Sequence, residues 1–231
     1  MSILVISACS GSKKYDAEVG QQETDAKSRV ELLAEVESTA SAREMYTGRE
    51  HQHVRSAVEQ LEQVTTVDWH IISAGLGLVR SDESICSYEC TFSGKSKGEL
   101  RERAIALGIQ PDGQTKDDLI SNIGDAKGIS RDLLALGPES YDYVLFVLGR
   151  EYFMAANHAV TNLPDSTNAI AFASEANRKH IGNCRWIRSS EQERAELGVA
   201  FIELKGQQLL SFVEDSKTLD EFTAQVDRAA N

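Results

Sequence analysis

The stretch Ser2-Ile-Leu-Val-Ile-Ser-Ala-Cys-Ser-Gly-Ser-Lys-Lys-Tyr15 decides the fold. Its apolar run, Ile3 to Ile6, is too short for an independent helix and too uniformly apolar for a half-exposed strand, so it predicts a strand buried on both faces. The residues that follow bring a thiol, hydroxyls, a glycine and two lysines to the end of that strand. Because ligands bind at the carboxyl ends of strands in open α/β sheets, we expect a binding edge from Cys9 onward.

The same pattern of an apolar run followed by small residues recurs along the chain. Residues 67–74 and 142–148 predict two more buried strands, and residues 168–174 and 183–188 predict a fourth and a fifth. An amphipathic helix is expected over residues 49–63. A helix between two strands makes a βαβ unit, and parallel pairing places the small-residue turns at one edge of the sheet.

These elements predict an α/β fold with a Rossmann-like, mostly parallel sheet flanked by helices. We expect residues 1–92 and 140–231 to form a single α/β domain, with the helical last forty residues covering the sheet. The polar residues 16–28 are expected to form a loop over the end of the first strand. Residues 94–124 are expected to be an insertion that interrupts the alternation of strands and helices.

The insertion is predicted to be a helical hairpin. Gly108 is a natural helix C-cap, and Thr115 with Asp118 three residues later resembles a capping box. The pattern E-L-R-x-R-A-x-x-L-G-I followed by T-K-x-D-L-I resembles the SAP and Rho-N-like modules, whose hairpins bind DNA or RNA. The matching cations here are Lys95, Lys97, Arg101, Arg103 and Lys116. An inserted hairpin that only caps the sheet or mediates oligomerisation is the alternative.

Composition limits the classes of partner. The 231 residues include 24 lysines and arginines against 36 acidic residues, a net charge of −12, which disfavours diffuse binding to nucleic acid or anionic membranes. Any phosphate contact must therefore be local. No segment approaches the roughly 20 apolar residues of a membrane span, and the N-terminal apolar run has no basic leader, so we expect a cytoplasmic protein. The four cysteines are expected to be free thiols without the spacing of a metal site.

A wider resemblance emerges when the motifs are taken in order. They are C-S-x-S-K at Cys9–Lys13, A-x-x-M-Y at Ala42–Tyr46, W-x-I-I-S-A-x-x-G-L at Trp69–Leu78, S-Y at Ser87–Tyr88 and G-x-x-Y at Gly149–Tyr152. This order is similar to the YaaA-related domain family of unknown function, whose members are often labelled peroxide-stress-like proteins. The first motif also resembles, more loosely, the C-S-x-x-K-x-Y element of the archaeosine synthase catalytic domain, in which a lysine captures the nitrile of a 7-deazaguanine base. Lys14 stands where that element has proline.

The candidate site residues follow from the three strand ends after Ile6, Ile72 and Leu148, which we expect to converge in one polar pocket. Ser10, Gly11 and Ser12 would form an anion-binding nest of backbone amides, with Lys13 as its counter-charge. The other candidate ligand-binding residues are Tyr46, Ser73, Gly75, Gly77, Tyr88, Gly149 and Tyr152.

Four residues are candidates for catalysis. Glu44 and Glu151 are the best-placed general acids or bases, because they lie in the motif loops. Cys9 is either a nucleophile activated by the neighbouring lysines or a wall of the pocket. Lys13 is the fourth. The sequence specifies no cofactor and no metal ligand set.

Two functional hypotheses follow. The first is a nucleotide- or nucleobase-handling enzyme, a hydrolase or transferase of the glycosidase or base-transfer type, acting on nucleic acid or its components. The second is a non-catalytic DNA-binding protein of stress response or phage defence that uses the hairpin. A subunit whose acidic surface mediates assembly is a third possibility, and the sequence leaves the oligomeric state open.

Overall fold

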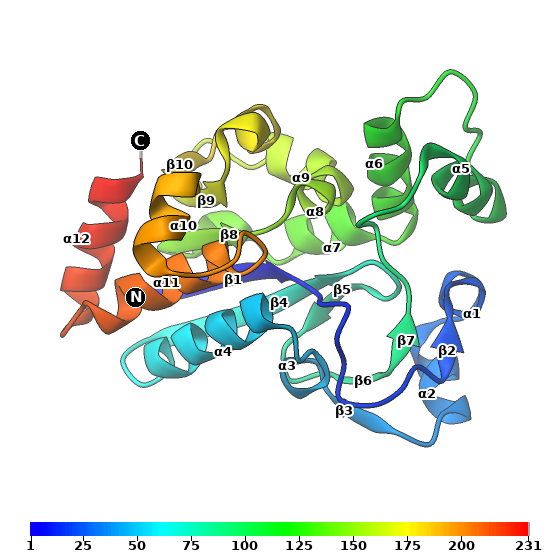
Figure 1. Cartoon of the computed structure of the whole chain (residues 1–231), viewed down its shortest axis with the longest axis horizontal. Helices are drawn as coiled ribbons and strands as arrows, with labels where there is room; N and C mark the ends of the chain where they lie inside the picture. The colour runs from blue at the N-terminus through cyan, green and yellow to red at the C-terminus, as the bar shows by residue number, and fades with distance from the viewer. Residues whose placement is uncertain (231) are drawn as a thin grey trace.

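A six-stranded sheet forms the centre of the molecule, in the strand order β10-β9-β8-β1-β4-β5 (Figure 1). The computed structural model describes residues 1–230. The strands are β1 (Ser2–Ala8), β4 (Thr66–Ser73), β5 (Gly77–Arg80), β8 (Tyr143–Val147), β9 (Ala169–Ala173) and β10 (Arg185–Arg188). All neighbours pair in parallel except β4 and β5, which are antiparallel. The mostly parallel α/β fold expected from the sequence is confirmed.

Strand β1 is the central element, as its apolar run predicts. It pairs with β4 through Ser2↔Thr66 to Ala8↔Ile72 and with β8 through Ile3↔Tyr143 to Ser7↔Val147. Its residues from position 3 to position 7 are buried, because neighbouring strands cover its edges and helices cover both its faces.

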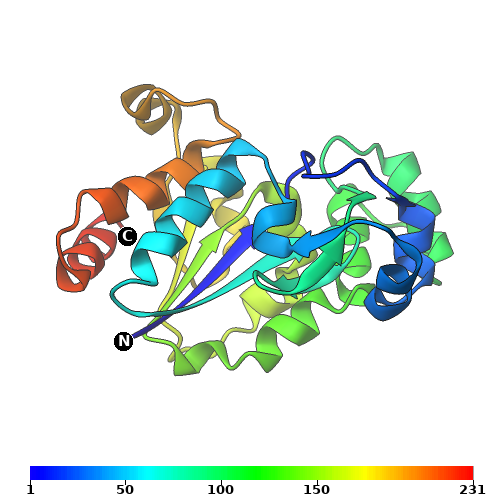
Figure 2. The same ribbon diagram turned by 90° about the horizontal axis from the view of Figure 1, so that it is seen from below.

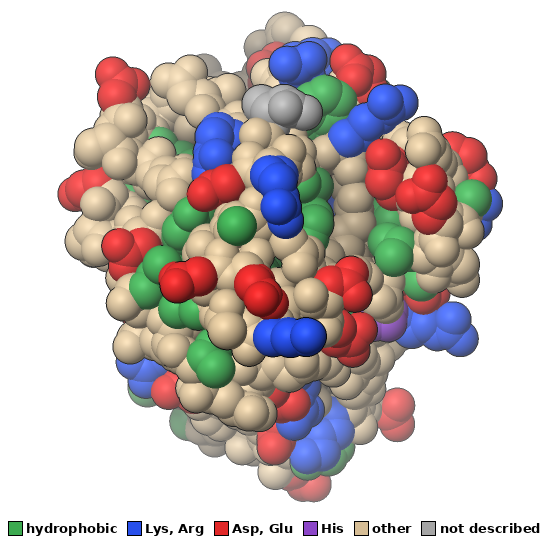
Figure 3. All heavy atoms as spheres, turned by 90° about the vertical axis from the view of Figure 1, so that its left-hand side faces the viewer, with side chains coloured by type: hydrophobic (Ala, Val, Ile, Leu, Met, Phe, Trp, Pro, Cys, Tyr) green, Lys and Arg blue, Asp and Glu red, His purple; other side chains and the backbone are tan. Residues whose placement is uncertain are grey.

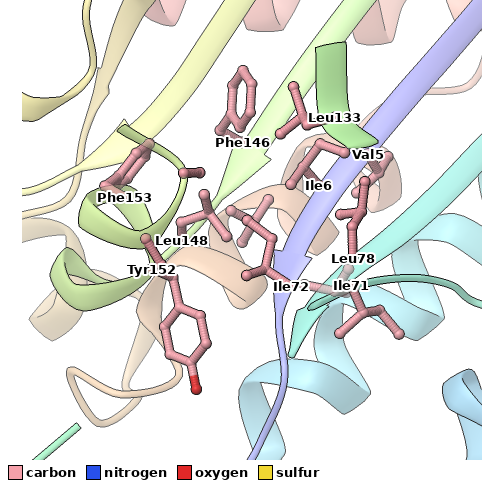
Figure 4. Close-up of a cluster of buried hydrophobic side chains, with 14 of the residues drawn as sticks. Val5, Ile6, Ile71, Ile72, Leu78, Leu133, Phe146, Leu148, Tyr152 and Phe153 are labelled. Carbon is pink, nitrogen blue, oxygen red and sulfur yellow. The ribbon is translucent and has the colours of Figure 1, made fainter. Parts of the chain in front are cut away.

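Helices cover the two faces of the sheet. On one face, α4 (Arg49–Leu61) and α11 (Leu204–Glu214) lie side by side across β1, β4 and β8 (Figure 2). On the other face lie α7 (Ile129–Ala135), α8 (Arg150–Ala155) and α9 (Asn157–Thr161). The apolar side chains between the sheet and this second layer include Ile6, Phe146 and Leu133, while the ring of Tyr152 points away from them (Figure 4).

The hairpin forms where the sequence predicts it. Its helices are α5 (Lys97–Ala106) and α6 (Lys116–Ala126), and Gly108 follows α5 with a left-handed φ of 76°. The capping box of α6 is present: Thr115 Oγ1 accepts from the amide of Asp118, whose carboxylate accepts from the Thr115 amide. Helix α6 packs against α8 and α5 packs against α6, so the hairpin lies beside the second helical layer.

Residues 16–28 differ from the expected loop. They contain β2 (Val19–Gly20) and α1 (Gln21–Ala26), followed by α2 (Arg29–Glu35). Val19 is buried because β2 pairs in parallel with β7 (Tyr88–Glu89). The Gly20 amide donates to the Glu23 carboxylate at 2.6 Å, which caps the first turn of α1. The prediction was wrong because a two-residue strand and a short capped helix leave no periodic apolar pattern in a polar sequence.

The remaining elements surround this framework. A second small sheet pairs β3 with β6, and the short helix α3 joins β3 to the loop before α4. These elements are β3 (Thr39–Ser41), α3 (Ala42–Met45), β6 (Ser84–Cys86), α10 (Glu191–Leu197), α12 (Leu219–Ala229) and the 3₁₀ helices at Pro138–Ser140 and Glu175–His180. On the side of the molecule that carries α12, basic and acidic side chains are interspersed (Figure 3). Within the described residues, no helix has both the length and the apolarity needed to cross a bilayer.

Candidate functional site

The ends of β1 and β8 meet at the point where the direction of strand addition reverses. From β1 the chain moves to β4 on one side, and it later adds β8, β9 and β10 on the other side. The crevice outside the carboxyl ends at such a reversal is the usual ligand site of open α/β sheets. Cys9 directly follows β1, and its Sγ lies 3.1 Å from Oη of Tyr152 in α8. The structure thus brings these two candidate residues together.

A chain of buried hydroxyl groups begins at the end of β4 and runs through Tyr88 to Tyr46. Ser73 Oγ lies 2.6 Å from Tyr88 Oη, which lies 2.8 Å from Tyr46 Oη. The Leu76 amide donates to Ser73 Oγ at 2.9 Å, which fixes the serine. Burial raises the pKa of Tyr46, Tyr88 and Tyr152, so the three phenols stay protonated at neutral pH. The chain can hold a neighbouring group in place through hydrogen bonds, but it supplies no phenolate.

Lys13 lies over this chain. Its Nζ is 4.4 Å from the centre of the Tyr88 ring and 3.5 Å from the carbonyl oxygens of Ser10 and Gly11. A β-bridge between Lys13 and Tyr46 holds its backbone. Burial lowers the pKa of Lys13, and the nearby Cys9, Cys90 and Glu89 partly oppose that shift. An ammonium group that is half-buried against an aromatic face is suited to contact a ligand and to exchange a proton with it.

A pocket of about 370 Å³ opens beside Lys13, which falls within the usual size range of small-molecule sites. Tyr88 and Cys90 form part of its wall, and burial raises the pKa of the Cys90 thiol. Two exposed carboxylates, Asp16 and Glu89, also line it. The full lining is Gly11, Lys13, Tyr15, Asp16, Ala17, Ser87, Tyr88, Glu89, Cys90 and Thr91.

Asp16 and Glu89 were not among the residues singled out from the sequence. The parallel pair of β2 with β7 and the hydrogen bond from Ser87 Oγ to the Tyr15 carbonyl bring their two segments together. Asp16 follows Tyr15 and Glu89 follows Tyr88 in the sequence, and both tyrosines line the same pocket. That adjacency is the only signal in the sequence that could have identified them.

The predicted anion nest is partly occupied by the protein's own contacts. Ser10 Oγ donates to the Ser12 carbonyl at 2.6 Å and accepts from the Gly48 amide at 3.1 Å. The Lys14 amide donates to the Met45 carbonyl, 2.8 Å away. The loop is therefore built to hold Lys13 in place, and the ammonium group is its principal feature for recognising an anion.

Two of the candidate glycines are required by packing. A Cβ on Gly75 would lie 3.0 Å from the Tyr88 ring, and a Cβ on Gly77, whose φ is 77°, would lie 2.5 Å from the Lys127 carbonyl oxygen. Gly149 is the N-cap residue of α8 in an extended conformation, next to the end of β8. Gly75 therefore positions Tyr88 at the pocket, while Gly77 joins the turn after β4 to the end of α6.

The two glutamates proposed as acids or bases lie outside the pocket lining. Glu44 forms an ion pair with Lys14 at 3.6 Å, and both side chains are a little under half exposed. Glu151 lies in the first turn of α8 and is half-buried. Among residues 1–230, the carboxylates that line the pocket beside Lys13 are Asp16 and Glu89.

Three of the five candidate nucleic-acid cations of the hairpin are already paired with acidic side chains. Arg103 is 2% exposed and donates to both oxygens of Asp25, at 2.8 and 2.7 Å, and to the Ala74 carbonyl at 2.7 Å. Lys95 pairs with Glu99 and Arg101 pairs with Asp112, each at 3.0 Å. Arg103 thus joins the hairpin to α1 and to the end of β4, away from any surface that a nucleic acid could reach. Lys97 is exposed and Lys116 is half-buried.

No group of three or more histidine, cysteine or acidic side chains within the described part of the chain is arranged to hold a metal ion. The four cysteines are free, as expected.

Comparison with known proteins gives one match. Residues 33–118 match the model of a family of unknown function, DUF6884, which covers less than half of the chain. The matched segment runs from α2 to the start of α6 and contains Tyr46, Ser73 and Tyr88, but it leaves out β1 and β8. No curated protein and no solved structure matches the chain.

Proposed function

We propose that the pocket beside Lys13 binds a nucleobase, and that the protein is a hydrolase or transferase acting at the N-glycosidic bond of nucleic acid or its components. One observation carries the proposal. A lysine ammonium lies over a buried tyrosine ring, in a pocket that is lined by the loop after β1 and the segment around β7 and has two carboxylates in its wall.

The pocket fits a planar ligand with acceptor atoms along its edge. Its volume of about 370 Å³ accommodates one base with part of a sugar. Lys13 offers N–H donors to the ring nitrogen and carbonyl oxygen acceptors of a base. Tyr15, which is 37% exposed and lines the same pocket, supplies an aromatic face for stacking.

The charges suit cleavage of a bond between a sugar and a base. As the bond between C1′ and the base nitrogen breaks, its electron pair moves to the base, and positive charge develops on the sugar. In our proposal, the Lys13 ammonium gives a proton to the departing base. Glu89 or Asp16 stabilises the cationic sugar and takes the proton of the attacking water or acceptor hydroxyl. These roles use the groups in the wall of the pocket and leave the buried tyrosines to hold Lys13 and the base in place.

The order of motifs that resembles the YaaA-related family supports the proposal, because those motifs include Lys13 and Tyr88, which line the pocket, and Tyr46, whose hydroxyl holds that of Tyr88. The DUF6884 family has no assigned function, so our proposal for the substrate class rests on the geometry of the pocket.

Release of free base from nucleosides and from short oligonucleotides, measured by chromatography, tests the proposal. We expect Glu89→Gln and Asp16→Asn together to reduce base release by about 10²-fold or more, as loss of positioned acid–base groups does. Glu44→Gln is the matched control, because it removes an exposed carboxylate that lies outside the pocket lining. Release that persists in the double variant, or falls equally in the control, would contradict the assigned roles.

A further inference from the structure

A second cavity, of about 210 Å³, lies on the other side of Gly75 from the first pocket. It forms between the start of α2, the turn after β4 and the start of α7. Its lining includes four basic side chains, Lys27, Arg29, Lys127 and Arg131, together with one carboxylate, Asp132. In a chain with a net charge of −12, this is a local concentration of positive charge.

Acidic side chains balance these cations only in part. Lys27 pairs with Glu35, Arg29 with Glu83 at 2.9 Å, and Arg131 with Asp132 at 2.8 Å. Each of these pairs lies at the surface, where such pairs are weak and easily exchanged for a ligand.

The buried part of the cluster has one negative charge for two positive charges. Asp25 is shared between Arg103, at 2.7 Å, and Lys127, at 3.5 Å, and all three side chains are at most 12% exposed. Burial lowers the pKa of Lys127 even though Asp25 is nearby. Nη1 of Arg103 is buried and has no hydrogen-bond partner among the described residues. Two buried cations therefore share one buried anion, and one of these cations, Lys127, lines a cavity whose other lining charges are mainly positive.

Gly75 and Tyr88 separate this cavity from the pocket beside Lys13. Gly75 lines the second cavity, Tyr88 lines the first pocket, and a Cβ on Gly75 would lie 3.0 Å from the tyrosine ring. A base in the first pocket and a negatively charged group in the second cavity would thus lie on either side of one layer of protein. The two cavities share no lining residue, so a strand that fills both passes around Gly75 and Tyr88, with its base on one side of them and a neighbouring phosphate on the other.

We propose that the second cavity binds a backbone phosphate of a single-stranded nucleic acid whose base occupies the pocket beside Lys13. This inference rests on the proposed function and names its substrate class: a strand rather than a free nucleoside. A base can enter the first pocket only when it has left the stack, so the strand is single or locally opened.

The test compares a nucleoside mixture with a short single-stranded oligonucleotide of random sequence, by equilibrium binding over a range of salt concentrations. The variant is Lys27→Gln with Arg131→Gln, two side chains that are 36% and 79% exposed. We expect its affinity for the oligonucleotide to fall roughly tenfold at low salt, with a salt slope shallower by about 0.7 for each phosphate that the variant no longer neutralises. Its affinity for nucleosides should stay unchanged.

The control variant is Arg55→Gln with Lys217→Gln, which removes the same charge away from both cavities. An equal fall in affinity in the control, or an oligonucleotide that binds wild-type protein no more tightly than nucleosides do, overturns the inference while leaving the proposed function standing. Wild-type protein that binds neither probe overturns the proposed function itself, and the inference with it.

Discussion

At the scale of single residues, the candidate site depends on how Lys13 is held. Burial lowers its pKa, while the Tyr88 ring and two backbone carbonyls favour the charged form, so its ammonium and amine forms are closer in free energy than those of a solvated lysine. Tyr88 can form this face only because Ser73 and Tyr46 fix its hydroxyl and Gly75 leaves room for its ring.

Gly75→Ala is expected to disturb the site through packing alone. The new methyl group would lie 3.0 Å from the Tyr88 ring and 3.2 Å from Thr24 Cγ2, both in buried surroundings. Overpacking of this kind costs about 1–3 kcal/mol of unfolding free energy. Gly11→Ala is the control, because nothing lies within 4 Å of its Cβ position, and its effect should stay within about 0.5 kcal/mol. Urea denaturation measures both, and equal stability of the two variants would contradict this account of Gly75.

At the scale of elements, Arg103 of the hairpin forms an ion pair with Asp25 of α1, although the sequence pattern of the hairpin predicts that this arginine contacts nucleic acid. The pattern identifies both helices and their caps, because local spacing determines these features. It cannot identify Asp25, which lies 78 residues from Arg103 and becomes its partner only when α1 forms in the segment expected to be a loop. The five strands of the parallel sheet were predictable from their apolar runs. The carboxylates of the pocket were not, since a two-residue pairing of β2 with β7 brings them together.

We therefore expect Arg103→Met to lower the free energy of unfolding. It leaves Asp25 buried, with Lys127 at 3.5 Å as its remaining cation, and loss of one partner from such a pair costs about 3–5 kcal/mol. Arg101→Met removes an exposed pair with Asp112 and should cost at most about 1 kcal/mol. Thermal and urea unfolding compare the two. If Arg103→Met is as stable as Arg101→Met and instead loses nucleic-acid binding, then Arg103 contacts nucleic acid and its ion pair with Asp25 does not stabilise the fold.

At the scale of the whole molecule, the folded state should lose stability in mild acid. His51 in α4 is 2% exposed, its Nε2 lies 3.1 Å from the Arg43 carbonyl oxygen, and burial lowers its pKa to about 4. Below about pH 6.5 the unfolded chain binds a proton at this position that the folded protein does not, so stability falls as the pH falls.

The expected slope from His51 approaches about 1.4 kcal/mol per pH unit as the pH falls toward about 5, above the range in which most carboxylates titrate. Burial also lowers the pKa of His70 and His180, so the diagnostic quantity is the difference in slope between wild-type protein and His51→Phe. Urea denaturation at several pH values measures it. Identical slopes in the two proteins would show that His51 is protonated in the folded state.

The central claim is that Lys13, over the Tyr88 ring, forms part of a nucleobase-binding pocket, and calorimetric titration with nucleobases and nucleosides tests it most directly. The account predicts that wild-type protein binds at least one of them. It also predicts that Lys13→Met, which keeps an unbranched side chain one atom shorter and removes its charge, loses that binding while unfolding at the same denaturant concentration. Wild-type protein that binds none of them, or Lys13→Met protein that binds as tightly as wild type, would contradict it.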